Sequence, residues 1–125
     1  MKKPSFSRWV INAAFIGLLV ASFSASSLAA SRFVTGFDDL PLMQGMTEIP
    51  DTNVSFDTTA GRIVIAFVRT SADREKIMTF YQTTLAQLGW RKHNEAGFLR
   101  EEEVLNFDYL SDGPETIVRF SLVPQ

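Results

Sequence analysis

Only one stretch of this chain has the periodicity of an amphipathic helix, and extended stretches lie on both sides of it. Apolar residues recur at spacings of three and four from residue 77 to 88, while polar residues take the opposite side. Gly89 follows and can end the helix in a left-handed conformation. Residues 70–73 approximate a capping box with Thr70 as the N-cap. A lone helix of this kind has to bury its apolar stripe against a sheet.

Six other stretches are predicted to be strands, at residues 53–57, 62–70, 90–93, 98–101, 104–110 and 116–123. In 62–70 both alternating faces are mostly apolar, which favours a strand in the interior of a sheet. In 116–123 apolar and polar residues alternate, which is typical of a half-buried antiparallel strand. The pair Glu102-Glu103 leaves two interpretations open, because it can form a turn or continue one long bent strand.

The predicted order is an arm, two strands, the helix, and then three or four strands. Short connections, including the glycine-containing loop at 94–97 and the turn cluster at 111–115, favour antiparallel pairing. We therefore expect an α+β domain over residues 53–125, with a single helix packed on one face of a curved antiparallel sheet.

The N-terminal residues have the pattern of an export signal. The first eight contain no acidic residue and three basic ones, Lys2, Lys3 and Arg8. An apolar stretch at 9–20 follows, and then small and hydroxylated residues. We expect residues 1–29 to be a signal peptide cleaved after Ala29, so that the protein is periplasmic or secreted. The alternative is an uncleaved helix over 9–30 that anchors the protein, since it just reaches the length of about 20 residues that spans a bilayer.

Charge and cysteine content exclude several classes of partner and site. The whole chain has 12 basic and 14 acidic residues, and the predicted signal peptide holds three of the basic ones, so the remainder carries 9 minus 14, or −5. An acidic surface disfavours nucleic acid and anionic lipid, so we expect neither nucleic-acid binding nor membrane association after cleavage. The absence of cysteine excludes disulfides, thiolate nucleophiles and cysteine-ligated zinc.

Residues 30–52 are expected to form an extended arm, because proline and glycine recur at intervals that prevent a sustained helix. The arm has too many apolar residues for a solvated linker, so we expect it to lie against the body of the domain. The same apolar residues are candidates for contacting an envelope protein or peptide: Leu40, Leu42, Met43 and Met46.

No pattern of catalytic residues is present, and we expect neither an enzyme nor a cofactor or metal site. His93 is the only histidine, and it is expected to be solvated at the end of a strand. The acids at 101–103 alternate between faces if they are extended, so they do not converge on one ion. No serine or threonine lies in a nucleophile motif. The many aromatic residues fill the core or, alternatively, line a pocket for a small apolar ligand carried between helix and sheet.

Several segments together resemble an uncharacterised family of small exported proteins of the kind found in alphaproteobacteria. The residues that carry the resemblance are Phe80-Tyr81-x-x-x-Leu85-x-x-x-Gly89-Trp90, the pair Phe98 and Arg100, the closing segment 118–124, and the earlier segments 39–43 and 56–63. These are packing and turn motifs spread over nearly the whole chain after the signal peptide. The resemblance implies export and this fold, and it implies no catalytic residues.

Overall fold

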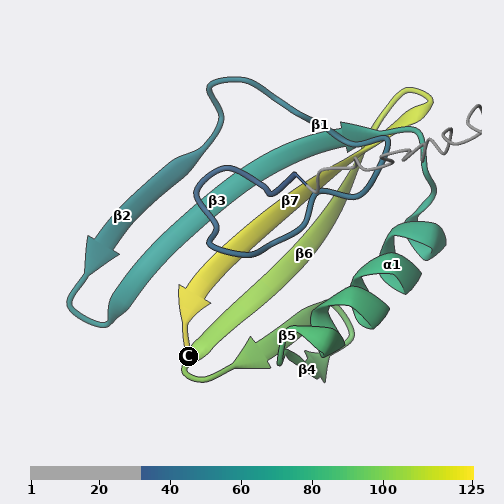
Figure 1. Ribbon diagram of the computed structural model, residues 1–125. Helices are drawn as coiled ribbons and strands as arrows, with labels where there is room; N and C mark the ends of the chain where they lie inside the picture. The colour runs from purple at the N-terminus through teal and green to yellow at the C-terminus, as the bar shows by residue number, and fades with distance from the viewer. Residues whose placement is uncertain (1–31) are drawn as a thin grey trace, which may run out of the picture. The chain divides into compact units, whose positions relative to one another are not determined.

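The computed structural model describes residues 32–125 and contains one helix and a seven-stranded sheet (Figure 1). The elements are β1 (Thr47–Glu48), β2 (Val54–Thr58), β3 (Gly61–Thr70), α1 (Arg74–Gln87), β4 (Arg91–Asn94), β5 (Gly97–Arg100), β6 (Glu103–Asp112) and β7 (Glu115–Pro124). Every strand pair is antiparallel. The predicted α+β class, with a single helix on a curved sheet, is therefore confirmed.

The sheet has the order β1-β3-β7-β6-β5-β4, and β2 also pairs with β3. Thr47 of β1 pairs with Arg69, and Val54 of β2 pairs with Ile65. The other side of β3 pairs with β7 along residues 64–70. Strands β1 and β2 therefore follow one another along the same edge of β3, and β4 forms the opposite edge of the sheet.

The helix and residues 32–46 of the arm cover the same face of the sheet (Figure 1). The arm crosses β3 and β7, and a Cβ atom at Gly36 would lie only 3.1 Å from a methyl group of Val64. Phe37 of the arm makes an edge-to-face contact with Phe120 of β7, with 6.4 Å between ring centroids. The arm thus covers β3 and β7 beside α1.

One hydrophobic core lies between the sheet and this covering layer. Its central contacts are edge-to-face pairs in which Phe107 meets both Tyr81 and Phe120, each with 5.1 Å between ring centroids. Its buried residues are Val34, Phe37, Leu40, Met43, Met46, Val64, Ala66, Val68, Ile77, Tyr81, Leu85, Trp90, Phe98, Leu105, Phe107, Val118, Phe120 and Leu122. Most of the aromatic residues within 32–125 therefore serve to fill the core.

The helix begins three residues later than the capping-box pattern predicts, so the prediction of Thr70 as N-cap is wrong. Asp73 is the N-cap, and its carboxylate accepts a hydrogen bond of 2.9 Å from the backbone N–H of Lys76. Thr70 is still part of β3, where it pairs with Thr116 of β7. The chain has to leave the sheet before a helix can start. The C-terminal prediction is confirmed, because Gly89 has a φ of +93°.

The connection between β5 and β6 is a tight turn, which decides between the two interpretations of Glu102-Glu103. Arg100 and Glu103 pair directly across the two strands, so Glu101 and Glu102 form the turn. Glu101 has a φ of +58°, an unfavourable conformation for a residue with a side chain. The turn is held in place from outside, since the backbone N–H of Gln125 donates to the Glu102 carbonyl at 2.8 Å.

The predicted signal peptide, residues 1–29, and the alternative anchor over 9–30 lie outside the described residues. Within 32–125, no helix combines the length and apolar character that crossing a bilayer requires. Residues 32–125 belong to one compact unit, in which the arm and the predicted domain over 53–125 share a core.

Candidate functional site

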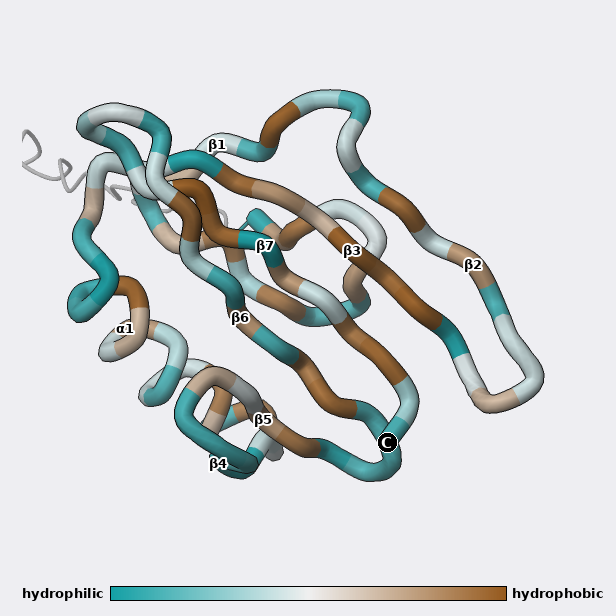
Figure 2. Tube along the Cα trace, turned by 180° about the vertical axis from the view of Figure 1, so that it is seen from behind, coloured by the Kyte–Doolittle hydropathy of each residue, from teal (hydrophilic) through white to brown (hydrophobic). Residues whose placement is uncertain are grey.

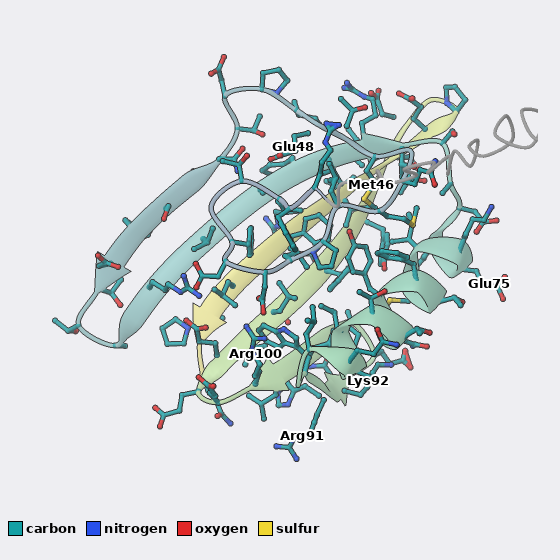
Figure 3. All side chains as sticks on the ribbon, in the orientation of Figure 1. Met46, Glu48, Glu75, Arg91, Lys92 and Arg100 are labelled. Atoms are coloured by element: carbon teal, nitrogen blue, oxygen red, sulfur yellow. The ribbon has the colours of Figure 1, made fainter. Side chains whose placement is uncertain are left out.

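The apolar residues of the arm are used in the core of this chain. Leu40, Met43 and Met46 are only 3%, 7% and 6% exposed, and Leu42 is partly buried against them. Figure 3 shows Met46 on the side of the arm that faces the helix. Their packing inside the chain accounts for the surplus of Leu and Met, so these four candidates do not form an exposed surface.

Tyr81 of α1 fixes the arm to the helix. Its hydroxyl donates a hydrogen bond of 2.7 Å to the Pro41 carbonyl and accepts one of 3.3 Å from the Met43 N–H. The Tyr81 side chain is fully buried, and burial raises the pKa of its phenol well above the ordinary value. The phenol therefore stays neutral and acts as a structural tie between the two parts of the covering layer.

Arg100 of β5 forms a second tie to the arm. Its guanidinium makes two hydrogen bonds to the carboxylate of Asp39, at 2.9 and 3.0 Å, and a third to the Leu88 carbonyl at 2.9 Å. It also lies over the Trp90 ring, 4.3 Å from the centroid. The hydrogen bonds from Arg100 hold the pKa of Asp39 below its usual range. Arg100 therefore has a structural role.

The other polar candidates do not converge on one place. His93 is exposed on β4, as predicted, and Glu101 and Glu102 are exposed in their turn. Glu103 accepts a hydrogen bond of 2.9 Å from Arg62. No group of three or more acidic, histidine or cysteine side chains within 32–125 is placed to hold a metal ion. These polar groups lie on separate parts of the fold, namely β4, the turn between β5 and β6, and the start of β6.

The strongest candidate for a binding site is the edge of the sheet at β2. All five residues of β2 are exposed, so neither the helix nor the arm covers the strand on either face. Two of them are large apolar residues, with Val54 44% and Phe56 49% exposed. Within the described chain β2 pairs only with β3, which leaves the backbone groups of its outer edge without a partner strand.

The exposed apolar residues of β2 continue onto β3. Val54 pairs with Ile65 and Phe56 pairs with Ile63, so all four point to the face of the sheet that the helix and arm leave bare. Phe67, two residues further along β3, lies on the same face. Figure 2 views this face and shows apolar colouring along both strands. We call these five residues the β2–β3 patch.

The two edges of the sheet differ in charge. Residues 47–61, which run along the β1 and β2 edge, contain Glu48, Asp51 and Asp57 and no lysine or arginine. At the opposite edge, β4 contains Arg91 and Lys92, and its pairing with β5 is irregular. Figure 3 shows Glu48 near β1, and Arg91 and Lys92 at the opposite edge of the sheet. Lysine and bulges are devices that protect an edge from pairing, and β2 has neither.

A cleft of about 500 Å³ opens where the arm meets the start of the helix. Its lining combines apolar and polar side chains, and Lys76 is its one charged residue: Met43, Gln44, Gly45, Thr70, Ser71, Ala72, Lys76 and Phe80. The volume lies within the range that small-molecule sites occupy. The cleft lies at the start of α1, and the region between helix and sheet is filled by the core.

Sequence reasoning predicted a strand close to β2 but did not identify it as a candidate site. The available signal was the alternation of Val54 and Phe56 with Ser55 and Asp57, next to a run without basic residues.

Comparisons of the chain with protein-family models, with curated proteins and with solved structures found no match. The family resemblance therefore stays a prediction.

Proposed function

We propose that this chain is an exported, non-catalytic domain that binds another envelope protein, or a peptide segment of one, by adding an extended segment of that partner beside β2. The observation that supports the proposal most directly is the exposure of the whole of β2. An outer strand with free backbone groups offers main-chain hydrogen bonds to an added strand, and the side chains beside it select the sequence.

The rest of the molecule is compatible with this role. Core, helix and arm are tied together by Tyr81 and Arg100, whose contacts lie away from β2 and leave its edge uncovered. The side chains of Tyr81 and Arg100, which are buried or partly buried, are engaged in contacts within the chain. Export is supported by the sequence pattern of residues 1–29.

The proposal is tested by photo-crosslinking in cells that make the full chain. A photoreactive residue at position 56 is expected to give a specific adduct with an envelope protein. The same residue at Gln82, on the exposed side of α1, is the control and is expected to give none. Equal adducts from both positions, or none from either, would contradict docking at β2.

The purified partner then gives a quantitative test. Phe56→Lys is expected to weaken its binding at least ten-fold, because a charge replaces an apolar contact at the docking edge. Phe33→Lys is the matched control, since Phe33 is 50% exposed but lies on the arm. Equal losses in the two variants would indicate a general effect of charge, and the assignment to β2 would be abandoned.

A second candidate function is the transport of a small apolar ligand, and the cleft at the start of α1 is the observation that favours it. Met43 and Phe80 provide an apolar surface there. Native mass spectrometry of the protein purified from its own compartment is expected to show bound mass if this function holds. A consistently empty protein would leave docking at β2 as the remaining candidate.

A further inference from the structure

We propose that the segment that adds beside β2 is cationic, with apolar side chains on one face and lysine or arginine on the other. This inference rests on the proposed function and identifies the chemistry of the partner. It follows from the two faces of β2, which carry different side chains, and from the charge of the edge to which β2 belongs.

The alternation of β2 determines what an added strand meets on each face. Val54 and Phe56 point to the bare face, where they continue the β2–β3 patch. Apolar or aromatic side chains of the partner can pack beside them there, because directly opposite residues of neighbouring strands have Cβ atoms about 5 Å apart. Every second residue of the partner is therefore apolar.

The opposite face of β2 carries Ser55 and Asp57, both exposed. The remaining acids of this edge are Glu48 and Asp51, and no lysine or arginine lies within residues 47–61. The nearest cations on β3 are already engaged, Arg62 with Glu103 and Arg69 with Glu115. The partner residues that alternate with the apolar ones consequently face Ser55 and Asp57, and the cation opposite Asp57 on β3, Arg62, is already bound to Asp38 and Glu103.

Charge complementarity favours a cationic segment over a second copy of the chain. Two copies that paired through β2 would bring two acidic edges together. The β4 edge is basic, but its residues Arg91, Lys92, His93 and Asn94 include no apolar side chain to meet the β2–β3 patch. Pairing of β4 with β5 is also irregular, which protects that edge from addition. The excess of acidic residues over 32–125 attracts a cationic segment before contact.

The test uses three fluorescent peptides of about seven residues and the full chain. One alternates Val with Lys, the second alternates Val with Glu, and the third has the Val and Lys residues of the first in separate blocks. We expect the alternating Val/Lys peptide to bind at least ten-fold more tightly than either other peptide at low salt. The advantage over Val/Glu is expected to shrink at high salt, because ions screen exposed charges over about 10 Å.

Two variants locate the effect. Asp57→Asn is expected to reduce the preference for Lys over Glu several-fold, whereas Glu95→Gln, which removes the same charge from the loop beside the opposite edge, is expected to leave it unchanged. Hydrogen exchange is expected to slow at residues 54–58 in the complex, since an added strand protects the outer backbone groups of β2.

Each other outcome overturns the inference in a distinguishable way. Equal binding of Val/Lys and Val/Glu with protection of 54–58 would leave strand addition standing and refute the cationic partner. Binding without that protection would contradict docking at β2 as well, and so would the failure of all three peptides combined with no adduct from position 56. Concentration-dependent self-association that Phe56→Lys abolishes would identify the occupant as a second copy.

Discussion

Removal of the Tyr81 hydroxyl tests how the arm is held on the domain. In Tyr81→Phe the aromatic ring and its contacts with Phe107 and Phe120 remain. The Pro41 carbonyl and the Met43 N–H both lose their hydrogen-bond partner in a buried setting. An unsatisfied buried backbone group costs about 1–3 kcal/mol. Because the bond from Met43 is long, we place its cost at the lower end and expect a total loss of about 2–4 kcal/mol in the free energy of unfolding.

Equilibrium unfolding in urea, followed by circular dichroism, measures this loss. Tyr109→Phe is the matched control, because the Tyr109 hydroxyl donates its hydrogen bond to the Met78 sulfur, and sulfur is a weak acceptor. We expect the control to cost less than about 1 kcal/mol. Amide exchange at Met43 should also accelerate in Tyr81→Phe. If the two variants unfold within about 0.5 kcal/mol of each other, the hydroxyl does not fix the arm and the reasoning is wrong.

The pH dependence of the free energy of unfolding tests the Tyr81 phenol a second time. An unfolded tyrosine loses its proton near the ordinary pKa of 10.0, whereas burial raises the pKa of folded Tyr81. The unfolded state therefore binds fewer protons above pH 10, and stability present below that pH is lost as the pH rises. Tyr81→Phe should show a flatter decline than the parent protein, with the remainder coming in part from Tyr109, whose pKa is also raised.

Other predictions concern the turn at β5, the salt link to the arm and a crowded glycine. Glu101→Gly should stabilise the protein by about 0.5–1 kcal/mol in urea unfolding, since it relieves a positive φ, whereas Glu102→Gly should destabilise it. Arg100→Met should lower the free energy of unfolding by about 1 kcal/mol. The loss is small because the Asp39 side chain is 38% exposed, so water screens the ion pair. The same variant should flatten the loss of stability in acid, because the lowered pKa of Asp39 gives stability that is present above the ordinary value of 3.8 and lost as the pH falls through the folded value. Gly97→Ala should lower the thermal midpoint, since a Cβ would lie 2.8 Å from an amide oxygen on β6, and an unchanged midpoint would show that this side chain moves freely.

The features predictable from sequence are those that local residues determine. Alternation over 116–123 predicted a half-buried strand, because the two-residue repeat of a strand is local, and Val118, Phe120 and Leu122 of β7 are buried. The position of the helix start was not predictable in this way, since Thr70 is held in β3 by pairing with β7, far along the chain. The turn at Glu101 was left open because its positive φ is unfavourable locally and is sustained by strand pairing on both sides.

The candidate site was less predictable than the fold. Valine and phenylalanine usually pack against a neighbouring layer when they lie in a sheet. No local pattern at Val54 and Phe56 indicates that the helix and the arm leave them uncovered. Their exposure depends on where the arm crosses, and this is set by Phe37 and Tyr81. The Leu and Met residues of the arm were the candidates for partner contacts in the sequence, but they are buried in the core or packed against it.

The pairing of β3 with β7 makes completion of the fold depend on a contact between distant segments. These strands flank one another in space, but the helix and three strands separate them along the chain. Contacts between distant segments form slowly, because the entropy of closing the intervening loop is lost before they reward it. Before β7 pairs, one edge of β3 has no partner strand and Phe37 of the arm has no contact with Phe120. Folding is therefore expected to be slower than in a domain whose paired strands follow one another along the sequence.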